Sequence, residues 1–426
     1  MKRRLGKIYR GLASALCILP IPCSWMLPLA GEEIAMLTTG ASRGVINPAL
    51  NTFIAGDKLN RRFAVVHEDI YAKAAYFQNG AEAVSLVSID CIGLTYPHVQ
   101  AIRKRASELL GHSKLAPKRV IVCSTHCHSG PDVVGIWGPE LGVSGRDEAY
   151  MEFLVETAAQ QVRIAAGKAV PVTARYGSGP HEQAWVENIC EPGVLDDELS
   201  VLQFLDAKGA NVLTLTNFAC HPTILDGVHD AVAADYVGGL YRGMSAAFGG
   251  EHLFLQGAVG AWVQPDKGDR SFDLADKYGR AVAARAQALL AAGKTLDSTE
   301  IAFAHKQFGI PLENEGWKQL SRMGVFGRDL GGEVTTEVAW FRIGEAQFAT
   351  HPGETPPAYS LQTKAWMKPG AHFVIGLGLD ALGYVLKPEY FEENAPPHAE
   401  YLTSMSAGKT TGPAILDALR SVIPAQ

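Results

Sequence analysis

The sequence contains few charged residues, no internal repeat and no low-complexity linker. Only 19% of its 426 residues are charged, the formal net charge is −6, and no cluster of Lys and Arg lies outside the N-terminus. These features argue against nucleic acid as a partner. No linker marks a domain boundary, so residues 31–426 are predicted to form one domain. A chain with 47% hydrophobic residues can bury a large core.

Cysteine is also scarce, and no stretch after residue 30 is apolar for long enough to span a membrane. Five of the seven cysteines lie after residue 30, an odd number without the spacing of a disulfide framework. Cys91, Cys123 and Cys220 lie in apolar, strand-like runs. They are therefore predicted to be small buried residues.

The first thirty residues differ from the rest of the chain. The segment MKRRLGKIYRG carries five Lys or Arg and no acid, and an apolar stretch broken by Pro20 and Pro22 follows it. A basic region before a short apolar region is typical of a secretory signal peptide. We expect residues 1–30 to be a signal peptide cleaved after Ala30, and the protein to be periplasmic or secreted. If translation instead starts at Met36, the protein is cytoplasmic.

Strands and helices alternate along the chain, but hairpins interrupt the alternation. Hairpins are expected at residues 72–90, where Asn79-Gly80 forms the turn, and at 198–223. Helices are expected at about 96–110, 147–168, 235–248, 272–292 and 356–367, with Asp235 as the N-cap of the third. Further strands are expected at about 119–124, 252–260, 299–308, 335–343, 346–350 and 372–377. This order predicts an α/β fold with mixed β-sheets flanked by helices.

Two histidines follow the predicted strand at 119–124, in the segment STHCHSGPD. At positions i and i+2 of an extended segment, the imidazoles of His126 and His128 would project from one face. Both can then bind one metal ion, or one can bind while the other lies beside it. A lone histidine near a strand is more often structural, and a His-x-His pair alone is a weak signal.

Three further polar residues follow predicted strands: His221 in NFACHPT, Glu354 in HPGET and Tyr384 in LGYVLKPEY. Taken alone, His221 can cap a strand, Glu354 can begin a helix and Tyr384 can be an aromatic at a strand edge. Together, histidines and a glutamate at separate strand ends fit a catalytic zinc site with a position open to water or substrate. Zinc lowers the pKa of bound water to about 7 and polarises a carbonyl, which suits amide or ester hydrolysis.

Seven segments in chain order resemble the N-terminal catalytic domain of the neutral/alkaline (non-lysosomal) ceramidase family. They are GASRGVINPA, STHCHSGPD, NFACHPT, AADYVGG, FLQGAVGAWVQP, HPGET and GLGLDALGYVLKPEYFEE. The resemblance covers about residues 37–420, and THCHSGP and PGET are its most specific parts. It implies the mixed α/β catalytic domain of that family.

The resemblance also implies a set of site residues. One zinc ion is expected to be bound by His126, His221, Glu354 and Tyr384. His128 is then expected beside the metal, orienting a ligand or transferring a proton. Asp90, at the end of a neighbouring strand, is a weaker candidate for orienting the ligands.

The sequence departs from the family pattern at the catalytic serine. That serine aligns with Gly257, and the Asn and Asp of the turn after it align with Ala258 and Ala261. Gly257 has no side chain to act as a nucleophile or to hold water, so zinc-activated water is expected to attack, with His128 or His229 shuttling protons. The sequence ends before the position of the family's C-terminal immunoglobulin-like domain.

The predicted activity is zinc-dependent hydrolysis of the amide bond of an N-acyl, ceramide-like substrate, with zinc activating water and Tyr384 helping to hold the oxyanion or the metal. The alternatives are a zinc esterase or lactonase, and a zinc-containing binding protein with weakened catalysis. The expected partner is a small or lipid-like acyl compound, including one presented at a membrane surface. Segment 133–144, with Val133, Val134, Ile136 and Trp137, is expected either to line an acyl cleft or to be a surface loop. Segment 323–332 is a candidate lid.

Overall fold

The computed structural model describes residues 36–425. The expected signal peptide at 1–30, its cleavage point and two of the cysteines, Cys17 and Cys23, lie outside the described residues. Within the described chain the five cysteines are buried and free, which confirms the prediction for Cys91, Cys123 and Cys220. Among the described helices, none combines the length and the apolar character needed to cross a membrane.

The first sheet has the strand order β5-β4-β3-β1-β6. Its strands are β1 (Thr38–Val45), β3 (Tyr71–Asn79), β4 (Glu82–Ile89), β5 (Val120–Ser124) and β6 (Val170–Pro171). β4 and β5 pair in parallel, whereas the other neighbours are antiparallel. Gly80 has a φ of 58° in the turn between β3 and β4. Glycine adopts this left-handed backbone readily, as expected for the predicted Asn79-Gly80 hairpin turn. The helices α1 (Tyr96–Leu110) and α2 (Glu148–Gly167) pack on this sheet.

The second sheet has the order β12-β10-β9-β7-β14. Its strands are β7 (Thr173–Pro180), β9 (Glu198–Leu205), β10 (Asn211–Phe218), β12 (Glu251–Gln256) and β14 (Lys294–Thr295). β10 and β12 are parallel, and the remaining pairs are antiparallel. The helices α3 (Tyr236–Phe248) and α4 (Phe272–Ala291) pack on it. As predicted, Asp235 is the N-cap of α3 and accepts a hydrogen bond from Tyr236 N.

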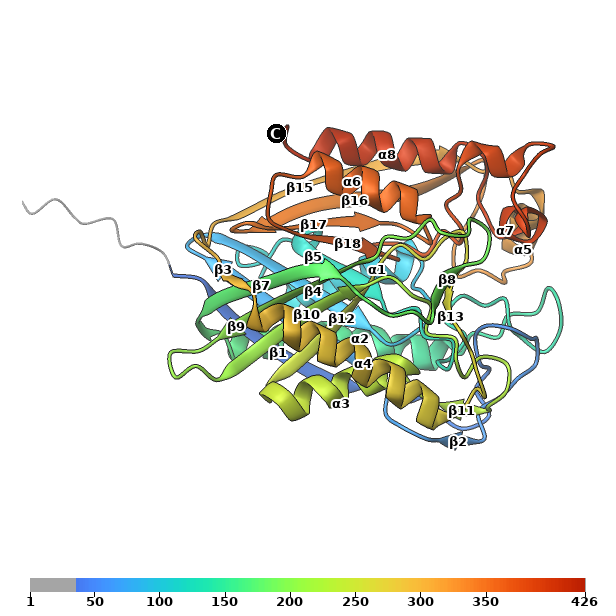
Figure 1. The fold of residues 1–426 in the computed structure, drawn as a ribbon. Helices are drawn as coiled ribbons and strands as arrows, with labels where there is room; N and C mark the ends of the chain where they lie inside the picture. The colour runs from blue at the N-terminus through green and yellow to red at the C-terminus, as the bar shows by residue number, and fades with distance from the viewer. Residues whose placement is uncertain (1–35, 426) are drawn as a thin grey trace, which may run out of the picture. The chain divides into compact units, whose positions relative to one another are not determined.

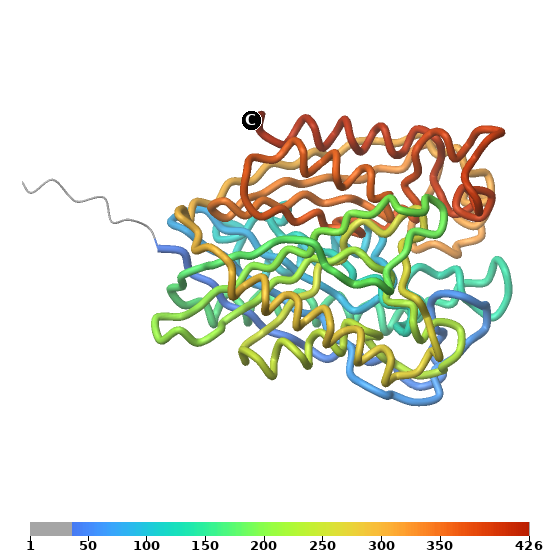
Figure 2. The backbone as a smooth tube through the Cα atoms, in the orientation of Figure 1, coloured from blue at the N-terminus to red at the C-terminus, as the bar shows by residue number. Residues whose placement is uncertain are grey.

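The third sheet is formed by the C-terminal part of the chain (Figures 1 and 2). It consists of β15 (Ile301–Pro311), β16 (Glu333–Ile343), β17 (Ala346–His351) and β18 (Ala371–Gly376) in that order, with β17 and β18 parallel. α6 (Pro357–Trp366) and α8 (Thr411–Val422) pack on this sheet. The remaining elements are short: β2 (Val65–Val66), β8 (Val186–Asn188), β11 (Ala231–Val232), β13 (Val263–Pro265), η1 (Pro117–Arg119), α5 (Glu315–Arg322), η2 (Pro388–Phe391) and α7 (Ala399–Ser404).

The two five-stranded sheets face each other, with a helix pair on each outer side (Figure 1). Polar side chains join them: Ser88 in β4 donates a hydrogen bond of 2.6 Å to Phe254 O in β12. The Asn217 amide of β10 donates to Leu255 O of β12 and to Val374 O of β18, which ties the second sheet to the third. The predicted class, α/β with mixed sheets flanked by helices, is confirmed.

The helix α5 was not expected from the sequence. It has eight residues, none of them buried, and such a short helix forms only with support from the rest of the fold. The hydroxyl of Ser321, near its end, is hydrogen-bonded to both Arg328 O and Leu330 N, which fixes the loop that follows.

Candidate metal centre

His126 and His128 lie just after β5, where the first sheet ends. His126 has a φ of 66°, so the expected extended segment is wrong: the chain turns sharply at this residue. A left-handed backbone is uncommon outside glycine, and a strained residue of this kind needs support from its surroundings. The turn still brings the two rings together, edge to face with centroids 4.8 Å apart. The Nε2 atoms of His126 and His128 are 3.4 Å apart.

His221 and Glu354 reach the same point from other sheets. His221 follows β10, and Glu354 follows β17 of the third sheet. The Glu354 Oε2 atom is 3.0 Å from His221 Nε2 and 3.4 Å from His126 Nε2. Three sheets therefore deliver one cluster, because the ends of β5, β10 and β17 converge.

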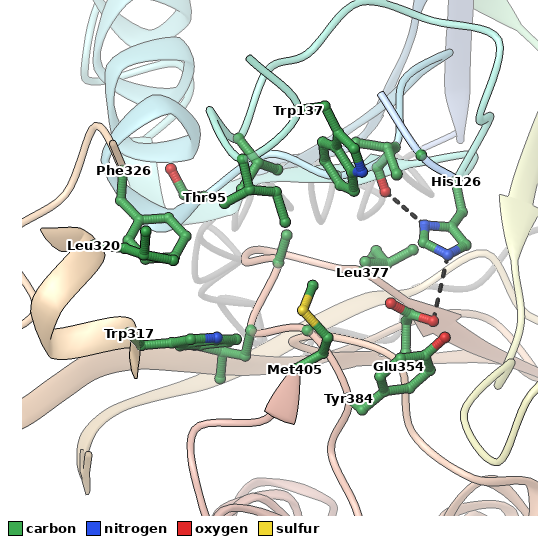
Figure 3. Close-up of a pocket in the computed structure, with 18 of the residues that line it drawn as sticks. Thr95, His126, Trp137, Trp317, Leu320, Phe326, Glu354, Leu377, Tyr384 and Met405 are labelled. Carbon is green, nitrogen blue, oxygen red and sulfur yellow. Dashed lines mark hydrogen bonds and ion pairs between the residues drawn. The ribbon is translucent and has the colours of Figure 1, made fainter. Parts of the chain in front are cut away.

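Tyr384 lies beside Glu354 because their backbones pair. Glu354 N donates to Gly383 O at 2.8 Å, and Val385 N donates to Glu354 O at 2.9 Å. Figure 3 shows the Tyr384 hydroxyl close to the Glu354 carboxylate. Burial, and then the charge of Glu354, raise the pKa of Tyr384 well above its ordinary value. In the absence of a bound cation, Tyr384 is therefore a neutral phenol and a hydrogen-bond donor.

The second ring nitrogen of each histidine is hydrogen-bonded, and these contacts define the tautomers. His126 Nδ1 lies 2.6 Å from Ile92 O, and His221 Nδ1 lies 2.6 Å from Val263 O. A carbonyl oxygen can only accept, so Nδ1 carries the proton in both rings. In the neutral imidazoles the Nε2 lone pairs then face the centre of the cluster. This is the arrangement in which histidines bind metals.

The charges of the cluster support the same reading. Burial alone would raise the pKa of the Glu354 carboxyl, but the charge of His126 and the close contacts with His126 and His221 lower it below its usual range. Burial lowers the pKa of His221 to about 4. For His126 burial also acts downward, but the Glu354 carboxylate reverses this effect and raises the pKa. The cluster thus presents an ionised carboxylate and neutral His221.

These residues fit a metal ion. One ligand atom from each of His126, His128 and His221 lies within 4.8 Å of the others, and Glu354 adds an oxygen beside them. Two Nε2 atoms 3.4 Å apart can share either a proton in a hydrogen bond or a cation. Three histidine nitrogens with a carboxylate form a donor set typical of zinc. Of the four ligands predicted, His126, His221 and Glu354 are brought together, and Tyr384 lies beside Glu354.

An apolar cavity of about 320 Å³ opens onto this cluster. His126, Glu354 and Tyr384 lie on one side of it, and Trp317, Leu320 and Phe326 lie on the other (Figure 3). Two segments singled out in the sequence contribute to its wall: Val134, Ile136 and Trp137 from 133–144, and Phe326, Arg328 and Leu330 from 323–332. Val133 instead is fully buried in the core. The prediction that segment 133–144 lines a cleft near the histidines is therefore confirmed, except for Val133.

Three other candidates lie elsewhere. Asp90 accepts hydrogen bonds from Tyr71 N and Tyr241 Oη, and none of its hydrogen bonds within the described chain involves a cluster histidine. Its expected role in orienting ligands is therefore wrong. His229 bonds to Arg270 O through Nε2 and does not line the cavity, so a proton shuttle through it has no support here.

Gly257 follows β12 and does not line the cavity either. The position requires glycine because of close packing and not because of a left-handed backbone. A Cβ atom at this position would lie 2.7 Å from Ala219 Cβ and 2.9 Å from Ala219 Cα. Its assignment as the position of the family serine stays a prediction.

Gly257→Ser should lower the free energy of unfolding by about 1–3 kcal/mol, because the added side chain overpacks against Ala219. Urea denaturation of the variant measures this change. The double variant Gly257→Ser/Ala219→Gly is the matched test. It should recover only part of the loss, because the Ala219 backbone also lies within 3.0 Å of the added atom. An unfolding free energy equal to that of the wild type would contradict the packing argument.

Two contributions were missed in the sequence. Trp317 and Leu320 of α5 line the cavity, and Asp226 lies 3.2 Å from His128 Nδ1. The turn segment LDGVHD around Asp226 carries no periodic signal that would have singled out this carboxylate.

The fold and the cluster define an α/β domain with a histidine–carboxylate cluster at its strand ends that could hold a metal ion. No protein-family model matches the chain. Among curated proteins it is similar to the neutral ceramidase of Pseudomonas aeruginosa, with 23% identity over 238 residues. That alignment covers 52% of this chain and 34% of the ceramidase, so the chain spans about a third of the length of its curated relative.

Solved structures extend the similarity over most of the chain. The crystal structure of neutral ceramidase from Pseudomonas aeruginosa has a TM-score of 0.73 at 17% identity, covering 91% of this chain and 74% of that one. A ceramidase complexed with C2 also has a TM-score of 0.73, at 16% identity and with coverage of 91% and 75%. The chain therefore has the fold of a neutral ceramidase-type domain, which confirms the resemblance seen in the sequence.

Proposed function

We propose that this protein is a zinc-dependent hydrolase that cleaves the amide bond of an N-acyl, ceramide-like substrate. The observation that carries the proposal is the buried histidine–glutamate cluster opening into an apolar cavity. The similarity to neutral ceramidases in sequence and fold supports the same substrate class. His126, His221 and Glu354 would hold the ion, with Tyr384 as the expected fourth ligand and His128 beside them.

When bound, zinc would lower the pKa of water and polarise the scissile carbonyl. The protein's own residues supply the rest. If Tyr384 does not bind the ion, its phenol is a donor for the oxygen on which negative charge develops. If the ion leaves His128 unbound, its Nε2 is the nearest proton acceptor. The apolar walls from Trp137, Trp317 and Phe326 exclude water and take up the acyl chain.

A second candidate follows from Gly257, which offers no side chain at the position aligned with the family serine. If catalysis needs that serine, the protein binds zinc and an acyl ligand without turning it over. Hydrolysis of esters or lactones is the other enzymatic candidate, because the same centre polarises an ester carbonyl.

Release of fatty acid from a labelled ceramide tests the proposal. The purified zinc-loaded protein should release the label, a chelator should abolish release, and added zinc should restore it. Substrates that differ only in an amide or an ester at the scissile bond separate the two hydrolytic candidates. Protein that contains one zinc per chain but cleaves neither ceramide nor short N-acyl amides would contradict amide hydrolysis. Binding of the labelled ceramide without release would then support the binding protein.

A further inference from the structure

Asp226 is the carboxylate closest to the second ring nitrogen of His128. Its Oδ2 atom lies 3.2 Å from His128 Nδ1, and the two residues are 98 positions apart in the sequence. Both side chains are largely buried, with exposures of 11% for Asp226 and 15% for His128. His126 and His221 use backbone carbonyls at the equivalent nitrogen, so His128 is the member of the cluster oriented by a charge.

The other oxygen of Asp226 faces an arginine. Arg61 Nη1 is 3.8 Å from Asp226 Oδ1, and within the described chain both atoms are buried without a hydrogen bond. Arg61 itself donates a hydrogen bond of 2.7 Å from Nη2 to His229 O. The guanidinium thus lies behind the carboxylate and favours its ionised form, so that Oδ2 acts only as an acceptor.

Gly56 lets the backbone pass directly alongside this pair. Its φ is 85°, and a Cβ atom at this position would lie 2.6 Å from His128 Nδ1 and 3.1 Å from Asp226 Oδ1. No other residue type fits here without displacing the histidine or the carboxylate.

We propose that Asp226 is a positioning residue that holds the Nδ1–H tautomer of His128 and thereby directs its Nε2 lone pair at the metal centre. Without this acceptor the ring can take the Nε2–H tautomer, whose proton would point at His126 Nε2, 3.4 Å away, and would block a cation. The inference rests on the metal site of the proposed function, not on its substrate. Carboxylates in this relation to a ligating histidine typically change metal affinity by about 10- to 100-fold.

The test compares Asp226→Ala with Asp230→Ala. Asp230 lies in the same loop and pairs with Arg61 at 3.5 Å, but its side chain is 57% exposed, and it forms no ion pair with His128 in the described chain. Nitrogen-15 NMR of the histidine rings in metal-free protein gives the tautomer of His128, assigned by comparison with His128→Gln. Zinc titration against a competing chelator gives the affinity. Thermal unfolding of both variants reports folding, and Asp226→Asn, which keeps the shape of the side chain, replaces Asp226→Ala if that variant does not fold.

In the wild type and in Asp230→Ala, His128 should be the Nδ1–H tautomer. In Asp226→Ala the Nε2–H tautomer should appear, and zinc affinity should fall about 10- to 100-fold. In Asp226→Asn the affinity should fall by at least the lower of these factors. An Nε2–H tautomer in the wild type, or a zinc affinity in the Asp226 variant within twofold of that of Asp230→Ala, would overturn the proposal. Both measurements work without substrate, so a zinc-loaded protein that cleaves no amide would contradict the proposed function and leave this inference intact.

Discussion

Glu354→Ala should abolish stoichiometric zinc binding and, with it, all chelator-sensitive hydrolysis. The Oε2 atom of Glu354 is the one anionic group within 3.4 Å of both His126 and His221 Nε2 in the described chain. Its removal leaves neutral imidazoles to bind a dication in a buried site. A metal centre contributes several kcal/mol to stabilising the transition state. Its loss therefore corresponds to about a thousandfold or more in rate.

Metal analysis of the dialysed protein and the initial rate of acyl release measure the two effects. Glu152→Ala is the matched control, because Glu152 is exposed in α2, away from the cluster. It should keep one zinc per chain and the wild-type rate. Full zinc stoichiometry in Glu354→Ala would remove Glu354 from the site.

Gly260→Ala should have the second large effect, because Gly260 is packed against the backbone that carries Glu354. A Cβ atom at this position would lie 2.3 Å from Glu354 O and 2.5 Å from Thr355 C. Gly260 N also donates to Thr355 O at 2.8 Å. Backbone atoms cannot rotate away as a flexible side chain can. We expect the free energy of unfolding to fall by about 3 kcal/mol, the upper end for overpacking, and zinc affinity to fall with it.

Urea denaturation and zinc titration check this expectation. Gly167→Ala is the control, since a Cβ atom there meets nothing within 4 Å. Gly167 is the last residue of α2, so the change should be neutral or slightly stabilising. If the free energy of unfolding of Gly260→Ala equalled that of the wild type, the backbone around Glu354 could shift to admit the added Cβ atom at little cost. In that case the predicted dependence of zinc binding on Gly260 would fail as well.

The elements of the fold were largely predictable because their signals are local. The apolar periodicity of residues 96–110 and 272–292 predicted helices that the structure places at Tyr96–Leu110 and Phe272–Ala291. The Asn79-Gly80 turn and the N-cap at Asp235 depend on the backbone preferences of single residues, and both were confirmed. The short helix α5 was not predicted, because eight residues are too few to show a clear helical periodicity. A helix of this length also depends on neighbouring elements for its stability.

By itself the sequence determined the mixed α/β class and the placement of His126, His221 and Glu354 directly after strands, because residue order and periodicity encode strand ends. The tertiary structure alone decided how these ends meet. It placed His221 3.0 Å from Glu354 across 133 positions, and Asp226 beside His128 across 98. It also replaced the expected extended segment with a left-handed turn at His126. Such contacts arise from the packing of three sheets, and no local pattern records which side chains the packing brings within hydrogen-bond distance.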